Sequence, residues 1–150
     1  MSEPWRRLAL YLLLLGSLGV AAELVLLGHY EDPWQWAPIT LLGLGLLVGT
    51  ALAVRTTRFL VRALRTLMLA FVLAGGVGVY LHLRSNVEFE LELRPSISGR
   101  ELIVETLRGA IPALAPGAMA QLGLLGLLVC FRHPSLHEAR TRSEGHPMET

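Results

Sequence analysis

The sequence predicts an all-α integral membrane protein, a four-transmembrane-helix bundle with both termini in the cytoplasm and a small cap on the outer side. Three observations support this fold class. Apolar runs long enough to cross a bilayer recur four times in 150 residues, and most charged residues lie between them. The arginines are shared unequally between the two sides that these runs define. The longest connection carries the pattern of a strand followed by a helix.

The first spanning helix is expected at about 8–28. This run is apolar except for Ser17 and Glu23. Arg6 and Arg7 in front of it also fit a cleavable signal peptide, whose hydrophobic region has about 7–15 residues. Because the apolar run continues past that length, we expect a spanning helix that is retained.

Three further spans are expected at about 38–54, 60–83 and 110–131. Pro38 suits the first turn of the second span, where its missing N–H costs nothing. Pro116 is expected to kink the fourth span or to mark where its regular helix begins. Four spans take up most of the chain, so we expect one membrane domain over residues 1–150.

The arginines predict the orientation. Four of them lie between the third and fourth spans, together with several glutamates, and nine lie on the opposite side: Arg6, Arg7, Arg55, Arg58, Arg62, Arg65, Arg132, Arg140 and Arg142. Because cytoplasmic segments carry the excess of basic residues, we expect residues 84–109 outside and a flexible cytoplasmic tail at 133–150. All thirteen basic residues are arginine, which is typical of a GC-rich bacterial genome. The expected location is therefore a bacterial cytoplasmic (inner) membrane.

The outer segment 84–109 is the insertion with a secondary structure of its own. Apolar and charged residues alternate over 87–94, which is the period of a half-buried β-strand. Pro95 ends the alternation, and Ser98 with Glu101 forms a capping-box pattern in front of a short amphipathic helix. We expect this helix to end at Gly109.

A single strand leaves unpaired backbone N–H and C=O groups, so the predicted strand needs a partner. One alternative is pairing with the loop at 29–37, with the same strand of a second copy or, by strand addition, with another protein. The other alternative is a strand that lies flat across the helix ends. In both cases the residues involved are Val87, Phe89, Leu91 and Leu93.

Glu23 is the principal intramembrane candidate, because an ionisable group in a spanning helix is costly and is by default a functional hypothesis. A structural interpretation gives it a hydrogen bond to a neighbouring helix, for instance to Gln121. A functional interpretation makes it the site of a proton- or cation-coupled carrier, since desolvation raises the pKa of a carboxyl group.

A second candidate site is a metal centre at the outer surface. His29, Glu31, Asp32 and His82 are all expected there, and imidazole with carboxylate ligands suits a divalent transition metal. The spacing matches no known metal motif, and histidines at a membrane surface are usually amphipathic anchors. The sequence predicts no cofactor.

Four arginines share one helical face at the start of the third span, because their spacing is three, four and three residues: Arg55, Arg58, Arg62 and Arg65. We expect them to bind anionic lipid head groups. Docking of an acidic cytoplasmic partner is the alternative. The chain has no recognition fold for nucleic acid, so no nucleic-acid partner is expected.

Small residues recur in the spans, which predicts close helix packing in a tight bundle or a homo-oligomer: Gly16, Gly19, Gly45, Gly49, Gly75, Gly76, Gly78, Gly123 and Gly126. The chain carries no recognisable catalytic constellation, so we expect no enzyme. The leading hypothesis is a non-catalytic accessory subunit or scaffold that contacts a membrane protein partner. The alternatives are a small transporter that uses Glu23 and a metal-binding membrane protein.

Overall fold

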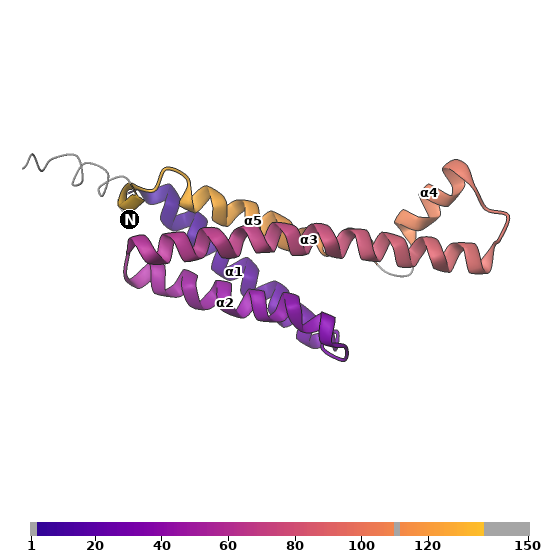
Figure 1. The fold of residues 1–150 in the computed structure, drawn as a ribbon, viewed down its shortest axis with the longest axis horizontal. Coiled ribbons are helices and arrows are strands. Elements are labelled where there is room, and N and C mark those ends of the chain that lie inside the picture. Colours follow the sequence, from indigo (N-terminus) through magenta and orange to yellow (C-terminus); the bar gives the residue numbers. More distant parts are fainter. Residues whose placement is uncertain (1–2, 110–111, 137–150) are drawn as a thin grey trace, which may run out of the picture.

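A computed structural model of the chain describes residues 3–109 and 112–136. All regular structure in these two ranges is helical, in the order α1 (Pro4–Leu26), η1 (Pro33–Gln35), α2 (Trp36–Val54), α3 (Arg58–Leu93), α4 (Gly99–Arg108) and α5 (Gly117–Cys130). Figure 1 shows α1, α2, α3 and α5 gathered in one bundle. The far end of α3 and the whole of α4 project beyond that bundle.

Three segments of the described chain are long and apolar enough to cross a membrane: Pro4–Leu26, Pro33–Val54 and Arg58–Leu93. Its helical content and these three segments fit a membrane protein of the helical class. At the rise of an α-helix, the 36 residues of α3 extend about 54 Å, whereas a bilayer core is about 30 Å thick. Helix α3 is therefore long enough to cross a bilayer and continue well beyond it.

The interior of the bundle is built from aliphatic and aromatic side chains of all four bundle helices. Helix α3 contributes the largest share, and its buried residues recur every three or four positions, as a helix with one inward face requires. The fully buried side chains of the four helices include Leu10, Leu13, Leu42, Leu52, Val61, Leu64, Met68, Phe71 and Val129.

Helices α3 and α5 pack closely because glycine lies at their contact. A Cβ atom on Gly75 would lie 2.6 Å from the backbone nitrogen of Ala120, and one on Gly123 would lie 2.7 Å from the carbonyl oxygen of Met68. In lipid, helices associate through such close approach of small residues. The expected packing role therefore applies to Gly75 and Gly123, whereas a Cβ on Gly76 would meet nothing within 4 Å.

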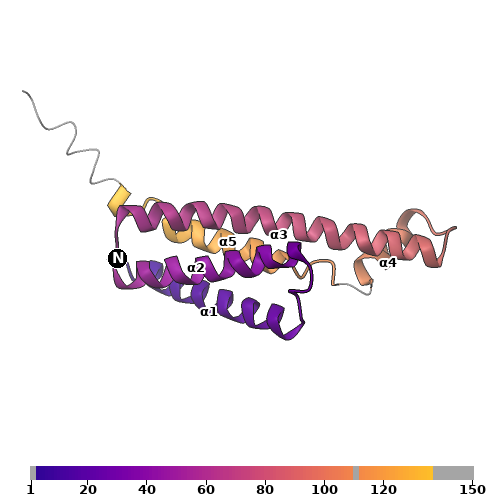
Figure 2. The same ribbon diagram turned by 60° about the horizontal axis from the view of Figure 1, so that its bottom comes forward.

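The start of α1 is joined to the end of α5 by Arg6, whose side chain is buried although it is charged. Its Nη1 donates to the carbonyl oxygens of Val129 (2.9 Å) and Phe131 (2.6 Å), and its Nη2 donates to that of Arg132 (3.3 Å). A cation at the last carbonyls of a helix satisfies acceptors that have no intrahelical donor. Figure 2 shows the start of α1, the turn between α2 and α3 and the end of α5 at one end of the molecule.

The predicted β-strand at 87–94 is wrong. These residues continue α3, which runs without a break to Leu93, and the described ranges contain no strand. Both alternatives for this segment, pairing as a strand and a flat strand across the helix ends, are therefore wrong as well. The residues assigned to strand pairing are helical: Val87, Phe89, Leu91 and Leu93.

The helix is favoured over the strand for two physical reasons. Extending a helix that already exists costs far less than starting a new element, and Glu and Leu, frequent here, are good helix formers. Ion pairs at helical spacing add to this preference. Arg84 lies 2.8 Å from Glu88, and Arg94 lies 2.6 Å from Glu90, each pair four residues apart.

Candidate functional site

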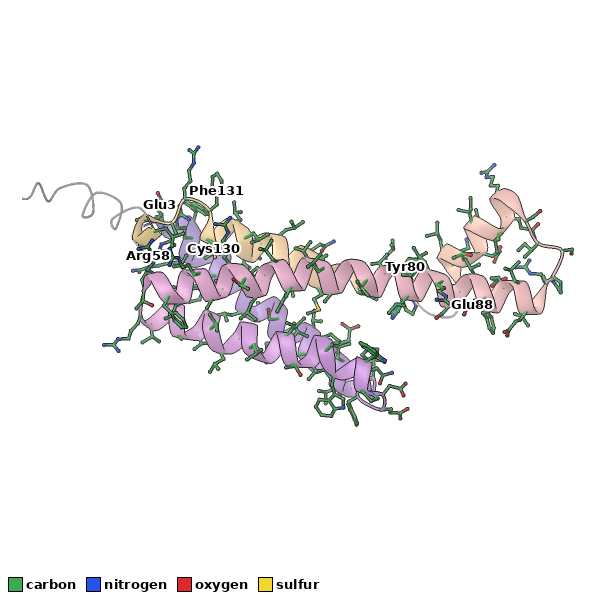
Figure 3. The ribbon with its side chains drawn as sticks, in the orientation of Figure 1. Glu3, Arg58, Tyr80, Glu88, Cys130 and Phe131 are labelled. Atoms are coloured by element: carbon green, nitrogen blue, oxygen red, sulfur yellow. The ribbon has the colours of Figure 1, made fainter. Side chains whose placement is uncertain are left out.

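The part of the molecule that projects from the bundle is the α3–α4 hairpin, which we define as residues 84–109. It comprises the last turns of α3, a short connection and α4. Figure 3 shows Glu88 in this hairpin, far from Glu3 and Arg58 at the opposite end, with Tyr80 between them. The short helix expected after Ser98 is present as α4, although the Ser98 side chain makes no capping hydrogen bond.

Helix α4 is fixed against α3 by a buried polar contact. The Nδ2 atom of Asn86 donates to the carbonyl oxygen of Thr106 at 3.0 Å, and Asn86 is fully buried. Gly109 packs directly on this group, since a Cβ there would lie 2.7 Å from the Asn86 Cγ. Ile97, in the connection, is also buried. The hairpin is therefore a packed unit rather than an open loop.

An arginine at the tip joins the two helices electrostatically. Arg94 donates to Glu90 of α3 at 2.6 Å and to Glu101 of α4 at 3.2 Å, and it lies 3.9 Å from Glu105. The hydrogen bond to Glu90 and the nearby carboxylates raise the pKa of Arg94. A single cation thus bridges three carboxylates of the two helices.

The hairpin also exposes large apolar side chains in a segment that is otherwise charged. Ile103 is 62 % exposed and Leu107 is 52 % exposed, one turn apart on α4. Phe89 and Leu93 on α3 are exposed as well. Exposed apolar surface with a polar rim is typical of protein–protein contact. We refer to Ile103 and Leu107 as the apolar pair of α4.

The two intramembrane candidates are not brought together. Glu23 on α1 and Gln121 on α5 both lie on exposed faces of their helices. Within residues 3–109 and 112–136, no hydrogen bond or ion pair links either side chain to another described residue. The bundle thus presents Glu23 outward rather than into a polar interior, and its functional role stays a prediction.

The metal candidates are separated in the fold. His29, Glu31 and Asp32 follow the end of α1, whereas His82 is on α3 with its Nδ1 3.1 Å from the carbonyl oxygen of Pro112. In the described part of the chain, no group of three or more His, Cys, Asp or Glu side chains is placed to hold a metal ion. The described residues therefore give the metal hypothesis no support.

The arginine face is formed only in part, because Arg55 is extended and lies outside α3. Arg55 is the residue after the last turn of α2, and Arg58, Arg62 and Arg65 lie on the first turns of α3. All four side chains are exposed. Their assignment to lipid head groups stays a prediction.

Two polar groups at the same end did not emerge from the sequence. One is Arg6, described above, and the other is His133, which is only 2 % exposed. Its Nδ1 accepts a hydrogen bond from the backbone N–H of Ser135 at 3.4 Å. Burial and the nearby Arg6 guanidinium lower the pKa of His133. Both residues read as ordinary flanking residues of a span, so no local pattern could have identified them.

No family model, no curated protein and no solved structure matches the chain. The α3–α4 hairpin is the strongest candidate, because it combines a fixed shape with exposed apolar side chains.

Proposed function

We propose that the protein is a non-catalytic accessory subunit of a bacterial inner membrane, which binds a partner protein through the apolar pair of α4 on its α3–α4 hairpin. The observation that carries the proposal is the rigid extension of α3 past the length of a bilayer, capped by α4 with Ile103 and Leu107 exposed. A surface held at a fixed height above a membrane suits recognition of another protein.

The proposal includes four membrane spans with both termini in the cytoplasm. Helix α5 has 14 residues, about 21 Å, and needs the preceding turns at 112–116 to approach the thickness of a bilayer. Its packing against α1 and α3 in one bundle favours a spanning role. The arginine-rich end of the bundle favours a cytoplasmic position for that end.

The proposed partner is a protein segment outside the membrane, and a second copy of this chain is the alternative occupant. We expect the exposed apolar side chains of the hairpin to supply most of the binding energy. Burying one large aliphatic side chain at an interface is worth about 1.5–3 kcal/mol.

The test is affinity capture of the full-length protein from native membranes at native expression. We expect one partner to be retained by the wild type and lost from a variant that carries Ile103→Gln with Leu107→Gln. The matched control is Arg108→Gln on the same helix, an exposed residue outside the apolar pair. The control is expected to retain the partner.

A strictly monomeric particle without any co-purifying protein would contradict the proposal. Equal capture by the wild type and the double variant would also contradict it. If the retained partner proves to be a second copy, the measured mass of the particle will be a multiple of the chain mass.

A further inference from the structure

A cavity of about 240 Å³ lies between the start of α1 and the end of α2. The start of α1 and the end of α2 belong to the arginine-rich end of the bundle, away from the α3–α4 hairpin (Figure 1). The lining of the cavity combines polar and apolar side chains: Arg7, Leu10, Tyr11, Ala53, Val54 and Thr56.

The polar half of the lining suits an anion. Arg7 supplies a guanidinium group, which matches a phosphate in charge and in geometry. Tyr11 and Thr56 each supply a hydroxyl group that can donate a hydrogen bond. The lining contains no carboxylate, so nothing in it repels a negative charge.

The apolar half indicates what kind of anion fits. Ala53 and Val54 offer hydrocarbon surface beside the polar groups, and Val54 is 81 % exposed at the edge of the cavity. A soluble phosphate gains nothing from such a surface, whereas a phospholipid places its glycerol and the start of its acyl chains there. Pockets for whole drug-sized ligands are about 300–1,000 Å³, so this cavity fits a head group and leaves the chains outside.

The charged residues around the cavity also favour an anionic ligand. The described residues at this end include seven arginines: Arg6, Arg7, Arg55, Arg58, Arg62, Arg65 and Arg132. Glu3, an acidic residue at this end, is paired with Arg6 at 2.8 Å. Figure 3 shows Glu3 and Arg58 at this same end. A positive potential of this kind concentrates anionic lipids of the facing leaflet.

We propose that this cavity is a specific site for the phosphate head group of an anionic phospholipid, held by Arg7, Tyr11 and Thr56. The apolar residues of the lining receive the adjoining glycerol and acyl carbons. This site is distinct from the exposed arginine face of α3, which can attract lipids only through diffuse charge. It does not depend on the partner of the α3–α4 hairpin, so the two proposals can fail separately.

The test is native mass spectrometry of the full-length protein in detergent, titrated with phosphatidylglycerol or with diacylglycerol, which has the same acyl chains and no phosphate. We expect one phosphatidylglycerol to be retained, and diacylglycerol to bind at least about tenfold more weakly, since a hydrogen bond to a charged group corresponds to about 10–100-fold in affinity. Arg7→Gln is expected to weaken phosphatidylglycerol binding by a similar factor. Arg132→Gln removes the same charge at the same end outside the cavity, and should change binding by less than about twofold.

A second variant tests the cavity without changing any charge. Ala53→Phe fills the site from an exposed position, so the bundle interior is not disturbed. We expect it to lose the lipid as Arg7→Gln does, while its lipid-free melting temperature stays that of the wild type.

Three results would overturn the proposal. One is an equal loss of binding in Arg7→Gln and Arg132→Gln, which would mean diffuse charge attraction. Another is unchanged lipid binding in Ala53→Phe. The third is displacement of the lipid by glycerol 3-phosphate at an equal concentration, which would mean a site for a soluble phosphate.

Discussion

Asn86 controls whether α4 stays against α3. Its side chain is fully buried and donates to the Thr106 carbonyl oxygen, so removing it leaves a buried acceptor without its donor. We expect Asn86→Ala to destabilise the closed hairpin by about 1–3 kcal/mol. Hydrogen–deuterium exchange should then be faster for the amides of α4 and unchanged for those of α1 and α2.

The exposed neighbour Ser85 provides the control, because Ser85→Ala changes no buried group. If Asn86→Ala left the exchange of α4 unchanged, the hydrogen bond would not hold the hairpin closed.

His133 makes the arginine-rich end sensitive to acid. Its pKa is lowered in the folded protein by burial and by Arg6, below the value of about 6.5 that an unfolded chain would show. The unfolded state therefore binds more protons than the folded state, and stability falls as pH drops below about 6.5. Above that pH the contribution of His133 is fully present.

The matched variant is His133→Asn, because an amide oxygen can accept the same hydrogen bond from Ser135 but does not titrate. Melting temperatures in detergent between pH 7.5 and pH 5 should fall more for the wild type than for this variant. Identical pH profiles would contradict the assignment.

Some buried polar residues could not be identified from the sequence. Arg6 and Asn86 acquire their partners through contacts between distant segments, and Arg6 reaches Val129 at the other end of the described chain. Periodicity and spacing carry no information on such contacts. For Glu23, the sequence identifies an unusual ionisable residue in a spanning helix, but it does not indicate that the side chain faces outward.

At the scale of elements, the contact between α3 and α5 depends on glycine. Gly75→Ala would drive a Cβ into the backbone of Ala120, and overpacking of this kind costs about 1–3 kcal/mol. Gly76→Ala is the control on the next residue, where a Cβ meets open space and helix propensity improves by up to about 1 kcal/mol. Thermal unfolding in detergent should show a lower melting temperature for Gly75→Ala only.

Equal melting temperatures for the two variants would mean that α3 and α5 are farther apart at Gly75 and Ala120 than the structure shows. A decrease in Gly76→Ala alone would place another protein surface on the outer face of α3.

The helical extension of α3 is itself testable. With Cys130 replaced by alanine, single cysteines at each position from 84 to 94 can carry a spin label. We expect solvent accessibility along this segment to repeat with the helical period of about 3.6 residues. A period of two would restore the strand that the alternating sequence indicates and would contradict the continuous α3.

The elements were predictable to different degrees. Long apolar runs indicated the segments that became α1, α2 and the first part of α3, because one physical requirement determines both length and composition. The strand prediction for residues 87–94 was wrong, because an alternating pattern of eight residues is compatible with a helix when the preceding segment already forms one. The close approach at Gly75 was indicated by residue type, whereas the open position of Gly76 was not.

At the scale of the whole molecule, the arginine-rich segments and the α3–α4 hairpin lie at opposite ends. The start of α1, the α2–α3 turn and the end of α5 share the arginine-rich end, and the α3–α4 hairpin is at the other end (Figures 1 and 2). The order of the spans predicts this separation, whereas the orientation that the arginines indicate stays a prediction. The sequence did not predict a rigid helical projection, because the length of α3 emerges only when residues 84–93 join the preceding helix.

The most direct test of the account is cysteine labelling in intact bacterial cells with a membrane-impermeant maleimide, in a Cys130→Ala background. Ser96→Cys at the exposed tip of the hairpin should be labelled in intact cells. Ser143→Cys, in the C-terminal segment, should be labelled only after the inner membrane is permeabilised. The reverse pattern, or labelling of both positions only after permeabilisation, would contradict a membrane bundle with its hairpin outside.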